Sequence, residues 1–101
     1  GTPTWVAPIT RLVVSSAGTL NLDIVTTDYV FTGTTSTWTL PVITGNTKFR
    51  YHIKNRGSGN LTVNSNAGGN DIYDAAAVNT ITVAAAAAIM LFNDGTYWLV
   101  E

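Results

Sequence analysis

Short runs of apolar or alternating residues recur along the whole chain, and residues that favour turns separate them. Many short strands at close spacing are typical of a β-sandwich or barrel rather than of βαβ units. The predicted strands are residues 9–15, 20–25, 29–32, 36–40, 47–54, 60–64, 80–83, 87–93 and 96–100. We therefore expect a single all-β domain over residues 1–101, an antiparallel β-sandwich of the jelly-roll type.

The segment 47–54 alternates between apolar and basic residues. Successive side chains of a strand point to opposite faces, so this strand has one buried face and one polar face. The polar face carries Lys48, Arg50, His52 and Lys54. These cations could receive phosphate or carboxylate groups of a bacterial surface polymer through charge-assisted hydrogen bonds. The alternative is a solvated face, or a subunit contact to aspartates such as Asp23 and Asp28.

The hairpin predicted at 87–100, with its turn at Asp94-Gly95, is apolar on both faces. A second sheet covers only one face, so the other face needs a further layer, which a neighbouring subunit can supply. We expect a subunit interface that contains Met90, Phe92, Tyr97 and Leu99.

Two segments are harder to interpret. The five alanines at 84–88 have the highest helix propensity, but the β-branched residues before them and the hairpin turn after them favour strand, turn and strand. Residues 64–79 are rich in Gly, Asn and Asp and predict a long loop, where binding sites are often found.

Composition narrows the classes of function. The chain has 101 residues, of which 11% are charged, no cysteine and a net charge of −1. Nucleic-acid binding needs clustered Lys and Arg, so we do not expect it. No apolar run reaches the ~20 residues of a membrane-spanning helix, so membrane insertion is not expected either. The start at Gly1 looks like that of a fragment cut from a longer protein.

From residue 37 to residue 100 the order of motifs resembles small β modules found in tail fibres, tail spikes and receptor-binding proteins of tailed bacteriophages. The motifs are Thr39-Leu40-Pro41, Gly45-Asn46-Thr47, Phe49, Ile53-Lys54-Asn55, Gly57, Gly59, Leu61-Thr62-Val63, Ile72, Ile81-Thr82-Val83, Leu91, Asn93-Asp94-Gly95-Thr96 and Trp98. The resemblance implies a β-sandwich, often trimeric, that serves virion structure and in some cases host attachment. Ala85-Ala86 departs from the family, which more often has Pro-Gly or Ala-Gly there. The pattern does not fix receptor-binding residues.

Catalysis and metal binding are not expected, and neither is a cofactor. A Ser/His/Asp triad would have to use His52, the only histidine, whose neighbours on the strand face are cations rather than a carboxylate. Asp71 and Asp74 could in principle cleave a glycoside or hold calcium. Aspartates in Gly- and Asn-rich loops are more often turn residues, however.

We expect a homotrimeric tail-fibre or receptor-binding module of the virion tail, which attaches to a host surface polysaccharide and contacts other tail proteins. Several weak sites on one rigid trimer would gain avidity. Alternatives are a purely structural connector and a carbohydrate-binding domain of a secreted bacterial protein. Aromatic rings that stack on sugars and polar groups around them suit a glycan. The predicted ligand-binding residues are Lys48, Arg50, His52, Tyr73, Asp71 and Trp38.

Overall fold

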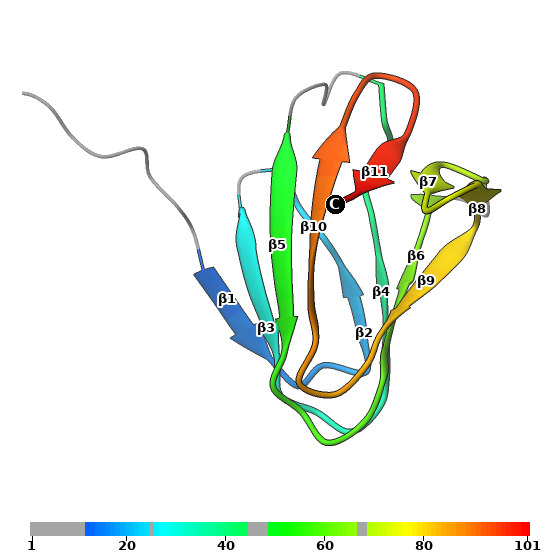
Figure 1. Cartoon of the computed structure of the whole chain (residues 1–101). Helices are drawn as coiled ribbons and strands as arrows, with labels where there is room; N and C mark the ends of the chain where they lie inside the picture. Colours follow the sequence, from blue (N-terminus) through cyan, green and yellow to red (C-terminus); the bar gives the residue numbers. More distant parts are fainter. Residues whose placement is uncertain (1–11, 25, 45–48, 67–68) are drawn as a thin grey trace, which may run out of the picture.

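A computed structural model describes residues 12–24, 26–44, 49–66 and 69–101. Within these ranges the chain forms eleven strands and no helix (Figure 1). The strands are β1 (Leu12–Ser15), β2 (Thr19–Asn21), β3 (Asp28–Phe31), β4 (Ser36–Thr39), β5 (Arg50–Asn55), β6 (Leu61–Asn64), β7 (Ile72–Tyr73), β8 (Ala77–Val78), β9 (Thr80–Val83), β10 (Ala88–Asn93) and β11 (Trp98–Val100). The all-β prediction is confirmed.

The strands form two sheets that pack face to face. One sheet has seven strands in the order β1-β3-β5-β10-β11-β7-β8, and the other has four in the order β2-β4-β6-β9. Figure 1 shows the two layers, with β1, β3, β5 and β10 side by side in one and β2, β4, β6 and β9 in the other. The predicted sandwich is therefore present in the described part of the chain.

The chain changes sheet after almost every strand of its first half. It runs from β1 to β2, from β3 to β4 and from β5 to β6, so that each pair makes one coil around the core. Because each coil returns to its starting sheet in the same direction, β1, β3 and β5 are parallel, and so are β2, β4 and β6. The predicted antiparallel arrangement is thus wrong for five of the nine strand pairings, which also include β11 with β7.

A fourth coil, formed by β9 and β10, runs in the opposite direction. Here β9 pairs antiparallel with β6 in one sheet, and β10 pairs antiparallel with β5 in the other. The predicted hairpin at Asp94-Gly95 is confirmed, because it joins β10 to the antiparallel β11.

The loops that cross between the sheets stack on one another at one end of the molecule. The Arg56 N–H donates to the Phe31 carbonyl oxygen (2.8 Å), and the Ser58 N–H donates to the Gly33 carbonyl oxygen (3.2 Å). Gly57 is required at this stack because a Cβ atom there would collide with the Gly33 carbonyl. Glycines at positions 57 and 59 would also suit a tight hairpin, but this loop joins β5 to β6 and crosses between the sheets.

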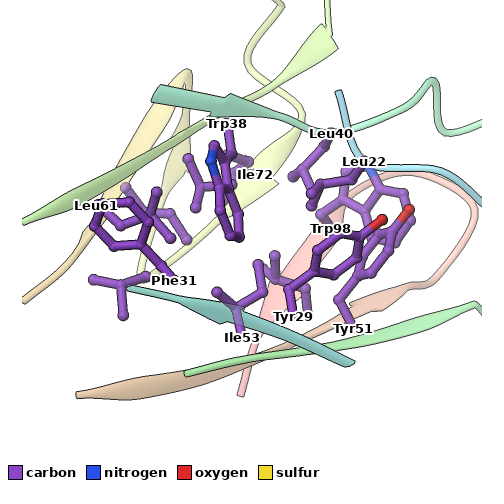
Figure 2. Packing of buried hydrophobic residues seen from close by; sticks show 14 residues of the cluster. Leu22, Tyr29, Phe31, Trp38, Leu40, Tyr51, Ile53, Leu61, Ile72 and Trp98 are labelled. Carbon is purple, nitrogen blue, oxygen red and sulfur yellow. The ribbon is translucent and has the colours of Figure 1, made fainter. Parts of the chain in front are cut away.

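The space between the sheets is filled by aromatic and branched side chains. Phe31 and Trp38 meet edge to face with ring centroids 5.5 Å apart, and Tyr51 lies 5.1 Å from Trp98. Figure 2 shows Phe31 with Leu61 at one end of this core and Tyr51 with Trp98 at the other. Full burial of such side chains contributes roughly 1.5–3 kcal/mol each, so the core is the main source of stability.

The structure clarifies the two segments that were hard to interpret from sequence, residues 84–88 and residues 64–79. Residues 84–87 form a turn in which the Ala87 N–H donates to the Ala84 carbonyl oxygen (2.9 Å), and β10 begins at Ala88. The prediction of strand, turn and strand is therefore correct for this segment, and a helix is absent from it.

The predicted loop at 64–79 is wrong in part, because β7 and β8 lie within it. Ile72 of β7 is fully buried, which explains why so short a strand is held in the sheet.

Candidate interaction surface

The two sheets present outer faces of different chemistry. The outward residues of the four-stranded sheet are all Thr or Asn and carry no charge; Thr19, Thr37, Thr62 and Thr82 form one row across it. We call this the threonine face. The seven-stranded sheet instead has both apolar and charged side chains on its outer side.

We call this second surface the mixed face. It consists of the outward side chains of β1, β3, β5, β10, β11 and β7. These are Leu12, Val14, Asp28, Val30, Arg50, His52, Lys54, Ala88, Met90, Phe92, Leu99 and Tyr73. Several large apolar groups on it are exposed, with Leu12 at 61%, Val14 at 52% and Met90 at 41% of their full accessible surface. Leu12 and Val14 lie on β1 and Met90 lies on β10, with β3 and β5 between them. Exposed apolar side chains on a soluble domain mark interaction sites mainly where they form a contiguous patch.

The strand register places the mixed face in rows. One row runs Tyr73, Leu99, Phe92 and Arg50 across four neighbouring strands. In the next row Met90 lies opposite His52, which lies opposite Asp28. Apolar side chains from the carboxy-terminal strands therefore adjoin the basic side chains of β5.

The charged groups of the mixed face are engaged within the chain. The Arg50 guanidinium lies 3.1 Å from the Glu101 carboxylate and 4.5 Å from the centroid of the Phe92 ring. His52 Nδ1 lies 3.5 Å from the Asp28 carboxylate. Such exposed pairs contribute at most about 1 kcal/mol each, so a partner could rearrange them at little cost.

Two of the predicted ligand-binding residues share one surface with two of the predicted interface residues. Arg50 and His52, expected to bind a ligand, are immediate cross-strand neighbours of Phe92 and Met90, expected at a subunit interface. The same patch cannot be buried between subunits and also hold a ligand. Lys48 lies outside the described residues, while Lys54 donates to the Ala86 carbonyl oxygen (2.6 Å).

Trp38 is not a ligand-binding residue, and this prediction is wrong. Its side chain is fully buried between the sheets, and its indole N–H donates to the Ala17 carbonyl oxygen (3.2 Å). Trp38 points inward because it alternates with Thr37 and Thr39 on β4, which face outward. That alternation was the signal in the sequence from which its burial could have been predicted.

Tyr73 and Tyr97 form an aromatic pair at the margin of the mixed face. Their ring centroids lie 5.3 Å apart, and the Tyr73 side chain is 41% exposed. Asp71 comes just before β7 and is half-buried, and its backbone carbonyl accepts the Trp98 N–H (2.7 Å). This margin is the part of the predicted ligand set that lies away from Met90.

The described residues contain no cluster of His, Asp and Glu suited to a metal ion, and they enclose no pocket. Burial strongly raises the pKa of Tyr51, whose hydroxyl donates to the Asp23 carbonyl oxygen (2.5 Å) inside the core. The hydroxyl therefore holds the backbone in place.

Two buried asparagines, Asn55 and Asn93, hold chain segments together. The buried Asn55 amide donates to the carbonyls of Gly59 and Val83, both at 2.8 Å, and accepts the Gly57 N–H at 2.9 Å. The buried Asn93 amide donates to the Ile43 carbonyl (2.9 Å) and accepts the Gly95 N–H (2.8 Å).

The Trp98 indole N–H likewise donates to the Pro41 carbonyl oxygen (3.2 Å). Sequence reasoning assigned these positions to turns and core without identifying the two asparagines as links between segments.

No protein-family model, curated protein or solved structure matches the chain. Function is therefore inferred from the chemistry of the two outer faces.

Proposed function

We propose that this chain is a homotrimeric attachment module of the bacteriophage tail-fibre type, without catalytic activity, that acts on the virion tail. The apolar part of the mixed face carries the proposal: Met90 is exposed, and Phe92 and Leu99 beside it are half-buried. Met90, Phe92 and Leu99 form a patch on the outer side of a sheet whose inner side is already covered by the second sheet. Burying this patch against equivalent patches of two other copies removes it from water.

The proposed ligand is a host surface polysaccharide, bound at the margin of the mixed face. The paired rings of Tyr73 and Tyr97 offer an exposed aromatic surface of the kind that stacks on sugar rings. Asp71 precedes this pair on the chain and supplies a carboxylate. Three such margins on one trimer would bind a polymer with avidity.

A second candidate, a structural connector that trimerises a fibre and contacts other tail proteins, is favoured by a different observation. Arg50, His52 and Lys54, the basic groups expected to recognise an anionic polymer, each have a partner within the chain. The connector shares the trimer with the first proposal and lacks the ligand.

Light scattering on three proteins tests the assembly. The parent should give a particle mass that is a multiple of three chains of 10.7 kDa. Met90→Lys places a charge in the buried patch and should abolish this threefold assembly. Thr82→Lys makes the same change at an exposed position of the threonine face and should leave the mass unchanged. A parent mass that is no multiple of three chains contradicts the proposal.

Binding to an array of bacterial surface polysaccharides separates attachment from connection. The parent should bind at least one polymer, and Tyr73→Ala should weaken that binding while leaving the particle mass intact. Met90→Lys should lower the apparent affinity by about 10²-fold or more, because avidity is lost. A threefold assembly that binds no polymer on the array would leave the connector as the function.

A further inference from the structure

Among the strands that the structure describes, those of the first coil leave one edge of each sheet without a neighbouring strand. Strands β1 and β2 are the terminal strands of the seven-stranded and the four-stranded sheet, respectively, and the same short loop joins them. The two open edges therefore lie at the same end of the stack of coils, next to each other. Figure 1 shows β1 at the margin of its layer beside β3.

Both edges direct backbone groups away from their own sheet. On β1 the Ser15 carbonyl oxygen accepts the Thr32 N–H (2.9 Å) that follows β3. Alternate residues of a parallel strand bond to opposite sides, so the N–H and C=O groups of Leu12 and Val14 point outward from the sheet edge. These groups can pair with another strand.

The same pattern holds on β2. The Gly18 carbonyl oxygen accepts the Thr37 N–H (3.0 Å), so alternate residues of β2 bond toward β4. The backbone groups of Thr19 and Asn21 consequently point outward. The coil thus presents two rows of outward donors and acceptors, one for each layer.

Nothing in the sequence of this coil blocks pairing. Natural sheet edges are protected by charged residues, especially Lys, by Pro or by bulges. Residues 12–21 contain no charged residue and no proline, and Val14 is 52% exposed. Such an edge is a template for another β-strand.

The molecule already contains the junction that would cover this edge. At the other side of the stack, the coil β5–β6 meets the coil β9–β10, which runs in the opposite direction. In one sheet β5 pairs with β10, and in the other β6 pairs with β9. The two coils also meet where their crossing loops begin and end, because the Asn55 N–H donates to the Ala87 carbonyl oxygen (2.9 Å). Two coils of reversed direction therefore fit together in this fold.

We infer that the β1–β2 edge docks against the same edge of a second copy of this chain. A twofold axis parallel to the strands would set β1 antiparallel to the partner's β2, and β2 antiparallel to the partner's β1. This arrangement repeats the topology of the internal junction, continues both sheets, and brings the two crossing loops together. It is an isologous interface, in which one surface patch meets its own copy.

This edge is separate from the patch around Met90, so the inference does not rest on the proposed trimer. If both contacts form, three edge pairs join two trimers into a closed assembly of six chains. If only the edge contact forms, the particle contains two chains.

The test uses prolines that remove only outward donors. Val14→Pro combined with Asn21→Pro deletes one outward N–H from each edge strand, where proline is tolerated. Thr82→Pro is the matched control, because Thr82 lies on β9 at the opposite end of the four-stranded sheet. Native mass spectrometry should show that the double variant has half the parent mass, while Thr82→Pro keeps it.

Two further measurements keep the result independent of any folding defect. Val14→Lys with Asn21→Lys retains every donor but places like charges across the twofold axis, and it should also halve the mass. Hydrogen exchange of the parent should show the Val14, Thr19 and Asn21 amides protected at high protein concentration and exposed on dilution.

Any of four results would overturn the inference: a parent of three chains, a parent mass that neither double variant changes, a mass that Thr82→Pro halves, or edge amides that are equally protected at all concentrations. Met90→Lys separates the two interfaces. A Met90→Lys particle of two chains supports the edge contact even if the parent forms no threefold assembly. A parent of three chains supports the trimer and contradicts the edge contact.

Discussion

At the scale of single residues, polar side chains in this protein mainly satisfy backbone groups. Asn55 and Asn93 each bridge chain segments from a buried position, and Trp38 and Trp98 each use their indole N–H to hold a loop carbonyl. Within the described residues no buried side-chain nitrogen or oxygen lacks a hydrogen-bond partner. A buried polar group without a hydrogen-bond partner costs about 1–3 kcal/mol of stability. Each of these positions therefore needs a side chain that can form the particular hydrogen bonds found there.

Asp94 gives the turn between β10 and β11 a dependence on pH. Its carboxylate accepts the N–H groups of Tyr97 (2.7 Å) and Thr96 (2.8 Å), and these backbone hydrogen bonds lower its pKa. Because the pKa is lower in the folded than in the unfolded state, ionised Asp94 stabilises the fold at pH values above the unfolded pKa of about 3.9. This contribution is lost as the pH falls through the folded pKa.

Asp94→Asn keeps a side-chain oxygen acceptor and removes the charge. We expect the variant to be slightly less stable than the parent in urea unfolding at neutral pH, and the difference should become smaller at acid pH, because protonation of Asp94 removes the charge in the parent as well. A difference that is equally large at both pH values would show that the charge is not the cause.

At the scale of elements, the crossing loops decide how the strands pair. The loop between β9 and β10 contains Ala86 with φ of 68°, a conformation that costs an L-residue about 1–2 kcal/mol. Its place in the loop is the third residue of a turn closed by the Ala87 N–H and the Ala84 carbonyl. Glycine adopts this conformation without strain.

Ala86→Gly should therefore stabilise the protein by about 0.5–1 kcal/mol, after allowing for the greater freedom of glycine in the unfolded chain. Ala85→Gly is the matched control. Ala85 lacks the positive φ, so the same change should destabilise by a similar amount. Chemical denaturation measures both. An Ala86→Gly variant no more stable than the parent would contradict the role assigned to this turn.

Much of the strand pattern could be predicted from sequence. Alternation located β9 to the residue, and it located β4, β5, β6 and β10 within a few residues of their ends. Alternation reports which face a side chain takes, but it carries no information on the direction of a neighbouring strand. A three-residue loop such as 16–18 suits a hairpin, so the parallel pairs were missed. The two-residue strands β7 and β8 are too short to show any period.

At the scale of the whole molecule, the two outer faces differ in how much apolar surface they expose to water. The threonine face is polar throughout and is well solvated, whereas the mixed face exposes Leu12, Val14 and Met90. Both faces of the carboxy-terminal hairpin are apolar, as the sequence predicted, and the core covers only the inner one, where Leu91 and Trp98 are fully buried. The outer side is the one assigned to neighbouring copies.

The candidate site could be predicted only in part. Alternation correctly placed Arg50 and His52 on one side of their strand and Met90 and Phe92 on one side of theirs. The pairing of β5 with β10 was not readable, so two predicted sites that occupy one surface were treated as separate. Trp38 was misplaced because the ability of aromatic rings to stack on sugars was given more weight than its position in the alternation.

Met90 is the only methionine of the chain, which makes it a direct reporter of whether the mixed face is covered. Oxidation of the thioether by dilute hydrogen peroxide can be followed by mass spectrometry over a range of protein concentrations. If copies of the chain bury this face, Met90 should oxidise slowly at high concentration and several-fold faster when the assembly is diluted apart. Oxidation at the rate of the unfolded chain at every concentration would contradict the account.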